Sequence, residues 1–515
     1  MKRLTAFLLC LCIAVGLMGC GTGDGYVPTG DGLTWDEDYT GPVYTHPSET
    51  EQSLTLTWYP DRSLNPYICT DFTNQALFSL LYQGLFATDR DYNVEPVLCE
   101  SFRVSEDMKT YTFYPAKATF SDGSVLTAQD IADSLTAAKA STVYQGRFLH
   151  VQEIQLTPDG GVSLVLDTSY EDLPLLLDMP IVKNSTLASD MPLGTGPYQV
   201  EGSGTAALLR RRTDWWCKAT MTVTAPTISL LPAESVTQIR DTFEFDSLDL
   251  VYADPGSDRY ADYRCDYELW DCENGIFLYL ACNMNSIVFN IPEIRSALTG
   301  AVDRDTLAAT YYRGFARTAT LPASPLSPNY NRTLASRYGY DGGEALTAAY
   351  AAAQLPGDTV VKLLVNGDDS LRTRVARDIA DGLRSCGMTV ELLALDTEQY
   401  RYYLKMGWFD LYLGQTKLSP NMDLSAFFHR NGAVSWGSVD SVSLYTLCME
   451  ALANHGNFYT LHQNIMDDGR LCPILFRSYA VYATRGLLTS LTPARDNVFY
   501  YSLGRSMEKA EITNG

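Results

Sequence analysis

The segment 359–395 limits the possible folds more than any other part of the chain. Its first part, "TVVKLLVN", is typical of a strand, and "DSLRTRVARDIADGLRS" is typical of a helix that stops at Gly387. A second strand, "MTVELLAL", follows at once. Two strands joined by a helical crossover run parallel in one sheet. We therefore expect an α/β protein.

The first 20 residues have the pattern of an export signal. Lys2 and Arg3 precede an uncharged, mostly apolar run of 16 residues, from Leu4 to Gly19. This run is shorter than the roughly 20 residues that span a bilayer as a helix. It ends in "LMGC", which resembles a bacterial lipobox, so Cys20 is the predicted lipidation site and 1–20 the signal. An ordinary cleaved signal with a chance cysteine and an uncleaved anchor are the alternatives.

Residues 21–52 are predicted to form an acidic tether. They contain seven acidic residues, no Lys or Arg, and many Gly, Thr and Pro residues. Such a segment cannot bury enough apolar surface to fold by itself. The glycine-rich "GTGDG" follows a signal rather than a strand, so we do not interpret it as a phosphate loop.

The remaining chain, from about Leu54 onward, is too long for a single hydrophobic core, so two or more lobes are expected. The formal net charge is −23, and loss of Lys2 and Arg3 with the signal leaves 36 basic against 61 acidic residues, or −25. A charge this negative argues against binding to nucleic acid and against docking on anionic lipid.

Nine cysteines remain after Cys10, Cys12 and Cys20 are set aside, and an odd number cannot pair completely. Exported proteins usually form disulfides, so we expect at most one or two bridges, with Cys265, Cys272 and Cys282 as the candidates for one of them. Growth without oxygen would explain nine unpaired thiols equally well.

The segment 110–135 contains a strand, a turn and a capped helix. "TYTFYP" alternates as a half-buried strand does, and Asp122-Gly123 marks the turn. Thr127 is the expected helix N-cap, with Asp130 three residues later as in a capping box. These acidic residues are interpreted as turn and cap residues, so the segment is a scaffold and not a catalytic site.

Known catalytic motifs are absent from the sequence. It contains no G-x-x-x-x-G-K-[ST], no H-E-x-x-H, and no G-x-S-x-G between a strand and a helix. His455 and His462 are seven residues apart, which is a weak metal signal without a third ligand. His429 is most simply a surface residue. We therefore expect no enzyme activity, no metal and no cofactor.

A series of motifs in a fixed order carries the most specific information in the chain. They are "SLNPY", "LLYQGLF", "PVL", "FSDGSVLTAQDI", "PLGTGPYQV", "RRTDWW", "FLYLACNMNS", "IPEIRSALTGAVDRDTL", "YGYDGGEALTAAY", "GWFDLYLG" and "CPILFRSYAVYAT". Their order resembles solute-binding protein family 5, the extracytoplasmic peptide- and nickel-type receptors of ABC importers. The resemblance extends from Leu54 to about Tyr501.

The resemblance implies a two-lobed fold of the periplasmic-binding-protein type, in the large type II variant with an accessory subdomain and two hinge strands. Lobe I would be formed by 53–278 and by the return of the chain at 478–515, with the accessory subdomain at about 87–190. Lobe II would span 279–477. The hinge strands would lie near 277–283 and 474–484.

The same resemblance implies a receptor that captures di- or oligopeptides by hinge closure and delivers them to an ABC permease and its ATPase. It would be a monomer, anchored by lipid on the outer side of the cell membrane. An oligosaccharide, a metal chelate or haem are alternative solutes within this fold. An exported hydrolase or an adhesion lipoprotein is the alternative from another class.

The ligand-binding residues implied by the resemblance are Asn65, Tyr67, Thr195, Gly196, Asn283, Gln415, Lys417 and Asp423. Each has a structural alternative, such as a turn at Asn65-Pro66 or at Gly196.

Relatives that bind free peptides commonly place an aromatic and then an acidic residue in the second-lobe loop. Here Lys417 and Pro420 stand at these positions, in "GQTKLSPNMDLSAFF". We therefore expect no carboxylate clamp for a free amino group, unless an alignment gap restores Asp423, and we expect Lys417 to attract a carboxylate-bearing ligand.

Overall fold

The computed structural model describes residues 54–217, 219, 221, 223–257, 263–507 and 511–513. All of them belong to one compact unit of the chain, His46–Gly515. The predicted signal, the predicted tether and the lipidation site Cys20 lie outside the described residues. Within the described part, no helix is both long enough and apolar enough to cross a membrane.

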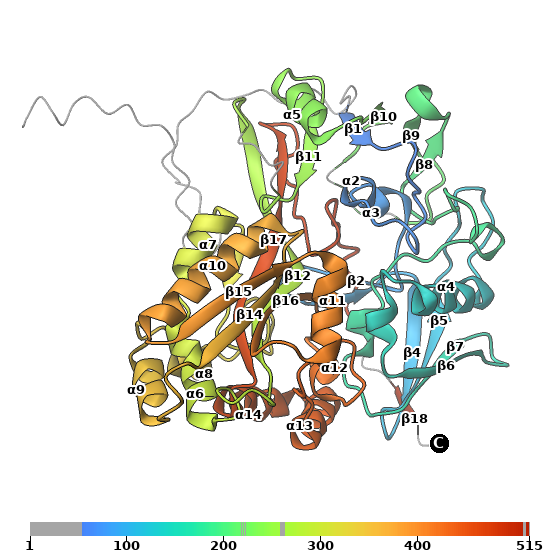
Figure 1. Cartoon of the computed structure of the whole chain (residues 1–515). Coiled ribbons are helices and arrows are strands. Elements are labelled where there is room, and N and C mark those ends of the chain that lie inside the picture. Colours follow the sequence, from blue (N-terminus) through green and yellow to red (C-terminus); the bar gives the residue numbers. More distant parts are fainter. Residues whose placement is uncertain are drawn as a thin grey trace, which may run out of the picture. The chain divides into compact units, whose positions relative to one another are not determined.

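The described chain contains both helices and strands (Figure 1). The strands are Leu54–Trp58 (β1), Phe86–Thr88 (β2), Val94–Pro96 (β3), Cys99–Ser105 (β4), Thr110–Pro115 (β5), Val151–Leu156 (β6), Val162–Leu166 (β7), Tyr198–Glu201 (β8), Leu208–Arg211 (β9), Thr227–Pro232 (β10), Leu250–Ala253 (β11), Tyr267–Cys282 (β12), Ala316–Thr318 (β13), Val360–Asn366 (β14), Thr389–Leu395 (β15), Leu411–Lys417 (β16), Leu471–Thr484 (β17) and Glu511–Thr513 (β18). The α-helices are Phe72–Gln75 (α2), Phe78–Leu81 (α3), Ala128–Ala140 (α4), Val236–Glu244 (α5), Pro292–Ala297 (α6), Arg304–Tyr312 (α7), Arg332–Ala335 (α8), Glu344–Ala352 (α9), Ser370–Ser385 (α10), Thr397–Met406 (α11), Ser425–Phe428 (α12), Val442–Ala453 (α13) and Phe458–Asp468 (α14).

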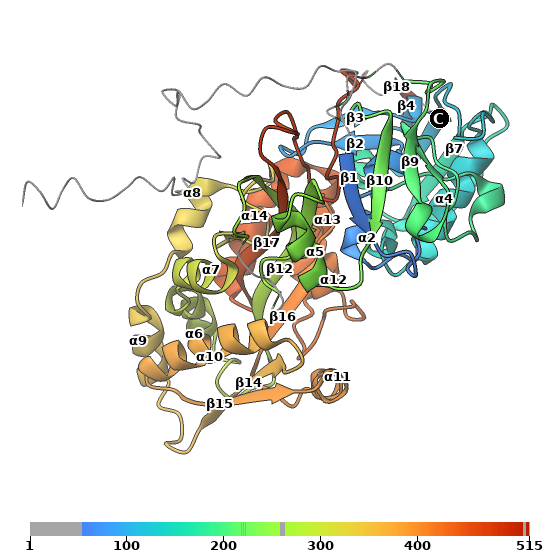
Figure 2. The ribbon, with the colours of Figure 1, turned by 90° about the horizontal axis from the view of Figure 1, so that it is seen from above.

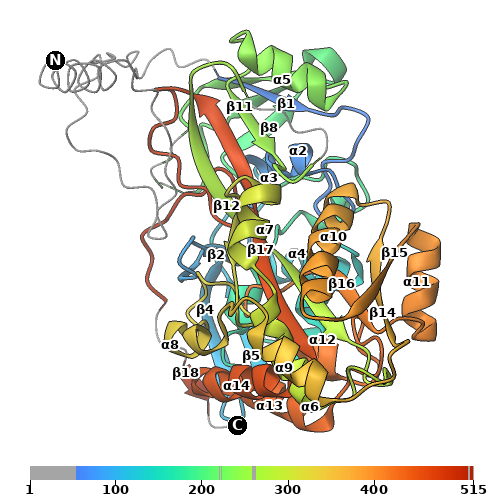
Figure 3. The same ribbon diagram turned by 60° about the vertical axis from the view of Figure 1, so that its left-hand side comes forward.

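The largest sheet has the strand order β11-β17-β12-β16-β14-β15, with β13 also paired to β17. β12 and β17 are long antiparallel neighbours, and Figure 3 shows them side by side. Successive side chains of a strand point to opposite faces. Leu278 and Leu280 therefore enter one hydrophobic core, while Phe277 and Tyr279 enter another.

Helices cover both faces of this sheet. Apolar residues of α6, α7, α9 and α10 belong to the core that contains Leu278. Those of α11, α12, α13 and α14 belong to the core that contains Phe277. The predicted crossover unit is confirmed, because β14 and β15 are parallel and α10 connects them. Asp369 caps α10, and Gly387 follows the helix with φ +90°.

Two smaller sheets share a third core with the segments around them. One has the order β1-β10-β9-β8 and the other β18-β4-β5-β7-β6, and Figure 2 shows both apart from the helices around β14 and β15. The scaffold interpretation of the segment 110–135 is confirmed. Thr127 and Asp130 form a capping box at α4, and Ile131 and Leu135 are buried.

The apolar spacing in "TNQALFSLLYQGLFATD" predicts one continuous helix, and this prediction is wrong. The segment contains two four-residue helices, α2 and α3, and Tyr82 is already extended. The backbone carbonyl of Leu81 accepts a hydrogen bond from the backbone N–H of Gly196, 3.0 Å away. The carbonyl at the end of α3 thus has a hydrogen-bond partner that is distant in sequence, and local helix propensity does not reveal this partner.

The expected disulfide among Cys265, Cys272 and Cys282 is also wrong, because all nine cysteines in the described residues are free thiols. Cys272 and Cys282 lie ten residues apart on the same strand, β12. At about 3.3 Å per residue their Cα atoms are separated by roughly 33 Å, far beyond the reach of a disulfide.

Candidate functional site

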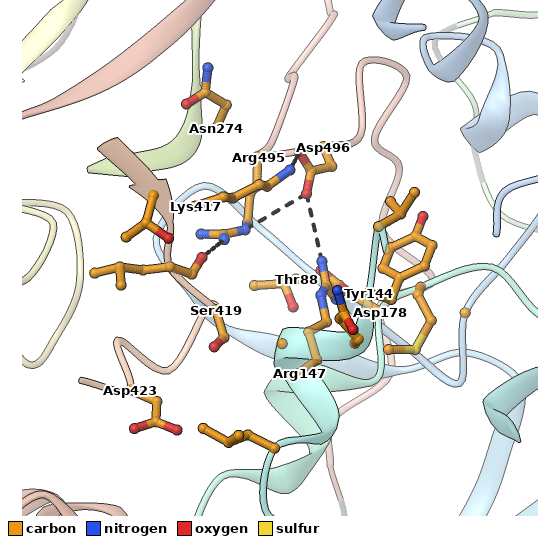
Figure 4. A pocket seen from close by; sticks show the side chains of 18 of the residues that line it. Thr88, Tyr144, Arg147, Asp178, Asn274, Lys417, Ser419, Asp423, Arg495 and Asp496 are labelled. Carbon is orange, nitrogen blue, oxygen red and sulfur yellow. Dashed lines mark hydrogen bonds and ion pairs between the residues drawn. The ribbon is translucent and has the colours of Figure 1, made fainter. Parts of the chain in front are cut away.

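A cavity of about 870 Å³ lies between residues of two hydrophobic cores, such as Phe78 of the core around the small sheets and Phe427 of the core that contains Phe277 (Figure 4). One wall comes from α3, β2 and the segments 142–150 and 178–180. The other wall comes from the end of β16, from α12 and from residues 431–434. The segment 494–497 also lines the cavity. The two long strands contribute Asn274, Ile276 and Tyr479. The volume is typical of a small-ligand site.

Asp496 is the centre of a charged cluster in this cavity. Its carboxylate lies 2.7 Å from Lys417 Nζ, 3.6 Å from Arg147 Nη2 and 3.9 Å from Arg495 Nε. Arg147 also pairs with Asp178. Desolvation inside the cleft acts to raise the pKa of Asp496, but the surrounding cations outweigh it and hold this pKa below its usual value. Desolvation lowers the pKa of Lys417, and Arg495 adds to that effect.

The guanidinium group of Arg495 is held at a bulge of β12. Its Nη2 donates to the carbonyl of Leu418 at 2.5 Å. A Cβ atom at Gly275 would lie 2.5 Å from the same nitrogen, and Gly275 has φ +74°. Only glycine adopts this conformation readily while leaving that space open. The pairing of β12 shifts register between Glu273 and Phe277, so the bulge brings the strand against Arg495.

His150 lies in another part of the cavity, between two carboxylates. Its Nδ1 is 3.0 Å from Asp167 Oδ1, and its Nε2 is 3.3 Å from Asp423 Oδ2 and 3.2 Å from Ser425 Oγ. The contact therefore connects β6 and β7 to the start of α12. Burial acts to lower the pKa of His150, but Asp423 and Asp167 outweigh it and raise this pKa above its ordinary value.

We expect this contact to depend on pH. Because the folded-state pKa of His150 is raised, its contribution to stability is complete below about pH 6.5, the unfolded value. It is lost as pH rises through the folded-state pKa. Asp423→Asn should therefore lower the free energy of unfolding by about 1.5 kcal/mol at pH 5.5 and by less at pH 8.5. Urea denaturation at both pH values measures this.

The exposed Asp358→Asn variant is the matched control and should have no such pH dependence. His455, which lies 2.8 Å from Asp172 and whose pKa is also raised, is present in every variant and cancels in the comparison. An equal loss for Asp423→Asn at both pH values would contradict the role of protonated His150.

Two of the predicted ligand-binding residues line the cavity, Lys417 and Asp423. Both already have partners within the chain. Lys417 pairs with Asp496, and Asp423 accepts a hydrogen bond from the backbone N–H of Ser425 at 2.7 Å in addition to its contact with His150. An amino-group clamp at Asp423 would have to compete with His150.

Asn65 and Tyr67 do not line the cavity. Asn65 Nδ2 donates to the carbonyls of Leu187 and Ser189 at 2.7 and 2.9 Å. The hydroxyl of Tyr67 donates to the carbonyl of Pro180 at 2.8 Å. These bonds hold the loop around Asn65 to the segment 180–189.

Thr195 and Gly196 also lie outside the cavity lining. The carbonyl of Thr195 accepts from Trp215 Nε1 at 2.9 Å. A Cβ at Gly196 would lie 2.4 Å from the carbonyl carbon of Leu81, so this glycine permits a close backbone approach.

Asn283 and Gln415 hold the large sheet together and are not part of the cavity lining. Asn283 Nδ2 donates to the carbonyls of Gly407 and Phe409, at 3.0 and 2.6 Å. Gln415 Oε1 accepts from Arg477 Nη1 at 3.2 Å.

Arg147, Arg495 and Asp496 line the cavity but were not predicted from the sequence. The only available signal was the "PARDN" turn, which begins nine residues after the end of the predicted second hinge strand. A charged turn where the chain leaves a hinge strand is well placed to reach a cleft, but no motif marks it.

Comparison with known families settles the family of the chain. The model of the bacterial extracellular solute-binding proteins, family 5, matches residues 93–436. The chain belongs to this family. The match includes β12, β14–β16 and the cavity segments 142–150, 178–180 and 431–434, whereas α3, β2 and 494–497 lie outside it. Members of this family are extracellular substrate-binding components of transport systems, not enzymes.

The chain is also similar to named proteins. It is 24% identical over 316 residues to the glutathione-binding protein GsiB of Salmonella choleraesuis, an alignment that spans 55% of this chain and 61% of that protein. The structure resembles the substrate-binding protein CtaP of Listeria monocytogenes, with TM-score 0.71, 17% identity and coverage of 87% and 97%. It also resembles the oligopeptide-binding protein AppA of Bacillus subtilis in complex with a nonapeptide, with TM-score 0.60, 18% identity and coverage of 84% and 94%. These structures support the predicted two-lobed fold.

Proposed function

We propose that the protein is the substrate-binding component of an ABC importer and that its solutes are short peptides. The observation that carries this proposal is the cavity of about 870 Å³, which residues of two different hydrophobic cores line. Its lining combines aromatic rings, such as Tyr82 and Tyr144, with polar and charged side chains. This mixture suits a ligand with many backbone hydrogen-bonding groups and varied side chains.

The division into lobes supports closure around such a ligand. We infer that 53–278 and 478–515 form lobe I, that 279–477 forms lobe II, and that β12 and β17 act as hinge strands. The separate hydrophobic cores favour this division. Two lobes joined by two strands move by hinge bending. The solute would then be passed to a membrane permease that an ATPase drives.

Binding and closure are measured together. Mass spectrometry of small molecules that remain bound through gentle purification should identify a peptide. That peptide, added at one hundred times its dissociation constant, should raise the free energy of unfolding by about 2.7 kcal/mol. It should also reduce the radius of gyration in solution scattering. A recovered solute that is not a peptide contradicts the peptide assignment, and saturating binding without compaction contradicts closure.

We further propose that Cys20 carries the lipid anchor, which the "LMGC" pattern and the acidic segment after it support. Cys20→Ala should prevent lipidation and release the protein from the membrane fraction. Retention of this variant in the membrane with an unchanged mature mass would contradict the anchor.

A further inference from the structure

Residues of the segment 150–172 contact residues of the segment 421–455 at several points. The backbone N–H of Glu171 donates to the carbonyl of Leu452 at 2.9 Å, and the Glu171 carboxylate accepts from the backbone N–H of His455 at 2.9 Å. On the proposed division of the chain, the first segment belongs to lobe I and the second to lobe II. Contacts between these segments must therefore break when the lobes separate.

Two histidines cross this contact in opposite directions. His150, in the first segment, places its Nε2 3.3 Å from Asp423 Oδ2 in the second segment. His455, in the second segment, places its Nε2 2.8 Å from Asp172 Oδ2 in the first. The side chains of His150 and Asp423 are 6% and 4% exposed, so water has little access to replace their contact. Each histidine thus depends on a carboxylate that the other segment provides.

The surroundings of His150 favour a proton on both ring nitrogens. Nδ1 lies 3.0 Å from Asp167, which belongs to the same segment, whereas Nε2 faces Asp423 across the contact. An ionised carboxylate only accepts hydrogen bonds, and a neutral imidazole donates from one nitrogen only. The charged imidazole donates to both carboxylates at once. Deprotonation therefore removes one of two charge-assisted hydrogen bonds.

Other titratable groups near His150 do not oppose this effect. The ring centroid of Tyr170 lies 6.0 Å from that of His150, and Tyr445 and Cys448 of α13 interact with the carboxylates that His150 contacts. Burial raises the pKa of Tyr170, Tyr445 and Cys448, so these three groups stay neutral where histidine titrates. His429 packs on Tyr445 of its own segment, with ring centroids 5.1 Å apart, and does not cross the contact.

His455 has two carboxylates beside it, those of Asp172 and Glu171. Burial acts to lower the pKa of His455, but Asp172 and Glu171 outweigh it and raise this pKa above its ordinary value. None of these three residues lines the cavity. Changes at His455 or Asp172 therefore test the contact without altering the surface that a solute would touch.

We infer that His150 and His455 form a pH-dependent latch, which holds the two lobes closed at acidic pH and releases them as pH rises. The inference rests on the proposed hinge closure, because it names what regulates that motion. Closure brings each histidine against a carboxylate of the other lobe, so the closed form binds protons more tightly than the open form. The latch is therefore complete below about pH 6.5, the ordinary value for histidine, and is lost as pH rises through the higher values of the closed form.

Solution scattering of the protein without added solute tests the latch. The radius of gyration should be smaller at pH 5.5 than at pH 8.5. His455→Gln and Asp172→Asn each remove one crossing pair and should each reduce this difference. His150→Gln combined with His455→Gln should abolish it. His429→Gln is the matched control, because it removes a histidine that does not cross the contact, and it should keep the full difference.

The dissociation rate of the peptide recovered in gentle purification is the second measurement. This rate should be at least about tenfold slower at pH 5.5 than at pH 8.5, the effect of one charge-assisted hydrogen bond. His455→Gln should reduce this ratio about threefold, because its ion pair is partly exposed. Titration of the peptide's own groups occurs with every variant and cancels in the comparison. A merely structural role of His455 would lower stability without changing the ratio.

The outcomes separate the latch from the proposed function. Equal radii of gyration at both pH values, together with compaction by the solute, overturn the latch and leave the proposed function intact. A radius that depends on pH equally in the original protein, His455→Gln and Asp172→Asn also overturns the latch, because other groups then cause the change. A pH dependence that these variants reduce, together with a recovered solute that is not a peptide, supports the latch and contradicts the peptide assignment. A radius that neither pH nor solute changes contradicts closure and the latch together.

Discussion

Arg304→Met should lower the free energy of unfolding by about 4 kcal/mol, measured by urea denaturation. Arg304 is 4% exposed, and its Nε donates to the carbonyls of Pro473 and Ala319 at 2.9 and 3.2 Å. Its Nη1 donates to the carbonyls of Thr299 and Val302 at 3.0 and 3.2 Å. Methionine fills much of the volume but donates nothing, so several buried carbonyls lose their partner at about 1–3 kcal/mol each.

The matched control for this variant is Arg337→Met, which changes the same residue type at an exposed position. It should stay within about 0.5 kcal/mol of the original protein. A loss of less than about 1 kcal/mol for Arg304→Met would mean that water or a shift of the loops satisfies these carbonyls, and that Arg304 does not brace the start of β17.

Gly196→Ala should lower the free energy of unfolding by about 3 kcal/mol, because the new methyl group has no room. The added Cβ would lie 2.4 Å from the carbonyl carbon of Leu81 and 2.6 Å from the carbonyl oxygen of Leu80. Both are backbone atoms, so no side-chain rotation relieves the overlap. Thermal unfolding monitored by circular dichroism measures the loss.

Gly339→Ala is the control for this variant. Gly339 has φ −68°, and a Cβ there meets nothing within 4 Å, so alanine should be neutral or slightly stabilising. Unchanged stability of Gly196→Ala together with loss of solute binding would support the alternative, in which Gly196 contacts the ligand directly.

Patterns that extend over a few residues predicted their structures correctly. The crossover unit of β14, α10 and β15 and the capping box at Thr127 and Asp130 form where the sequence placed them. In each case the signal is local, because apolar spacing and cap residues act on neighbours in the chain. The end of α3 at Leu81 was not predictable in this way, since the backbone partner of Leu81 is the distant Gly196.

The candidate site also combines residues that the sequence predicted with residues that it did not. The sequence located the loop after β16, and two of its predicted residues, Lys417 and Asp423, line the cavity. It missed Arg147, Arg495 and Asp496, which come from other segments. Asn65, Tyr67 and Asn283 were chosen because they stand in motifs, but their side chains bond to the backbone of their own chain. A motif marks residues that the fold needs as readily as residues that a ligand needs.

By itself the sequence determined the α/β class, the resemblance to a family of solute receptors and elements such as β14, α10 and β15, because each of these depends on local spacing or on a linear order of motifs. Only the tertiary structure decided which charges meet. Asp496 lies next to Arg495 in the chain, but its contacts with Lys417 and Arg147 exist because the segment 494–497 passes between two walls of the cavity. Coulombic interactions depend on distance in space and on exclusion of water, and neither is encoded in separation along the chain.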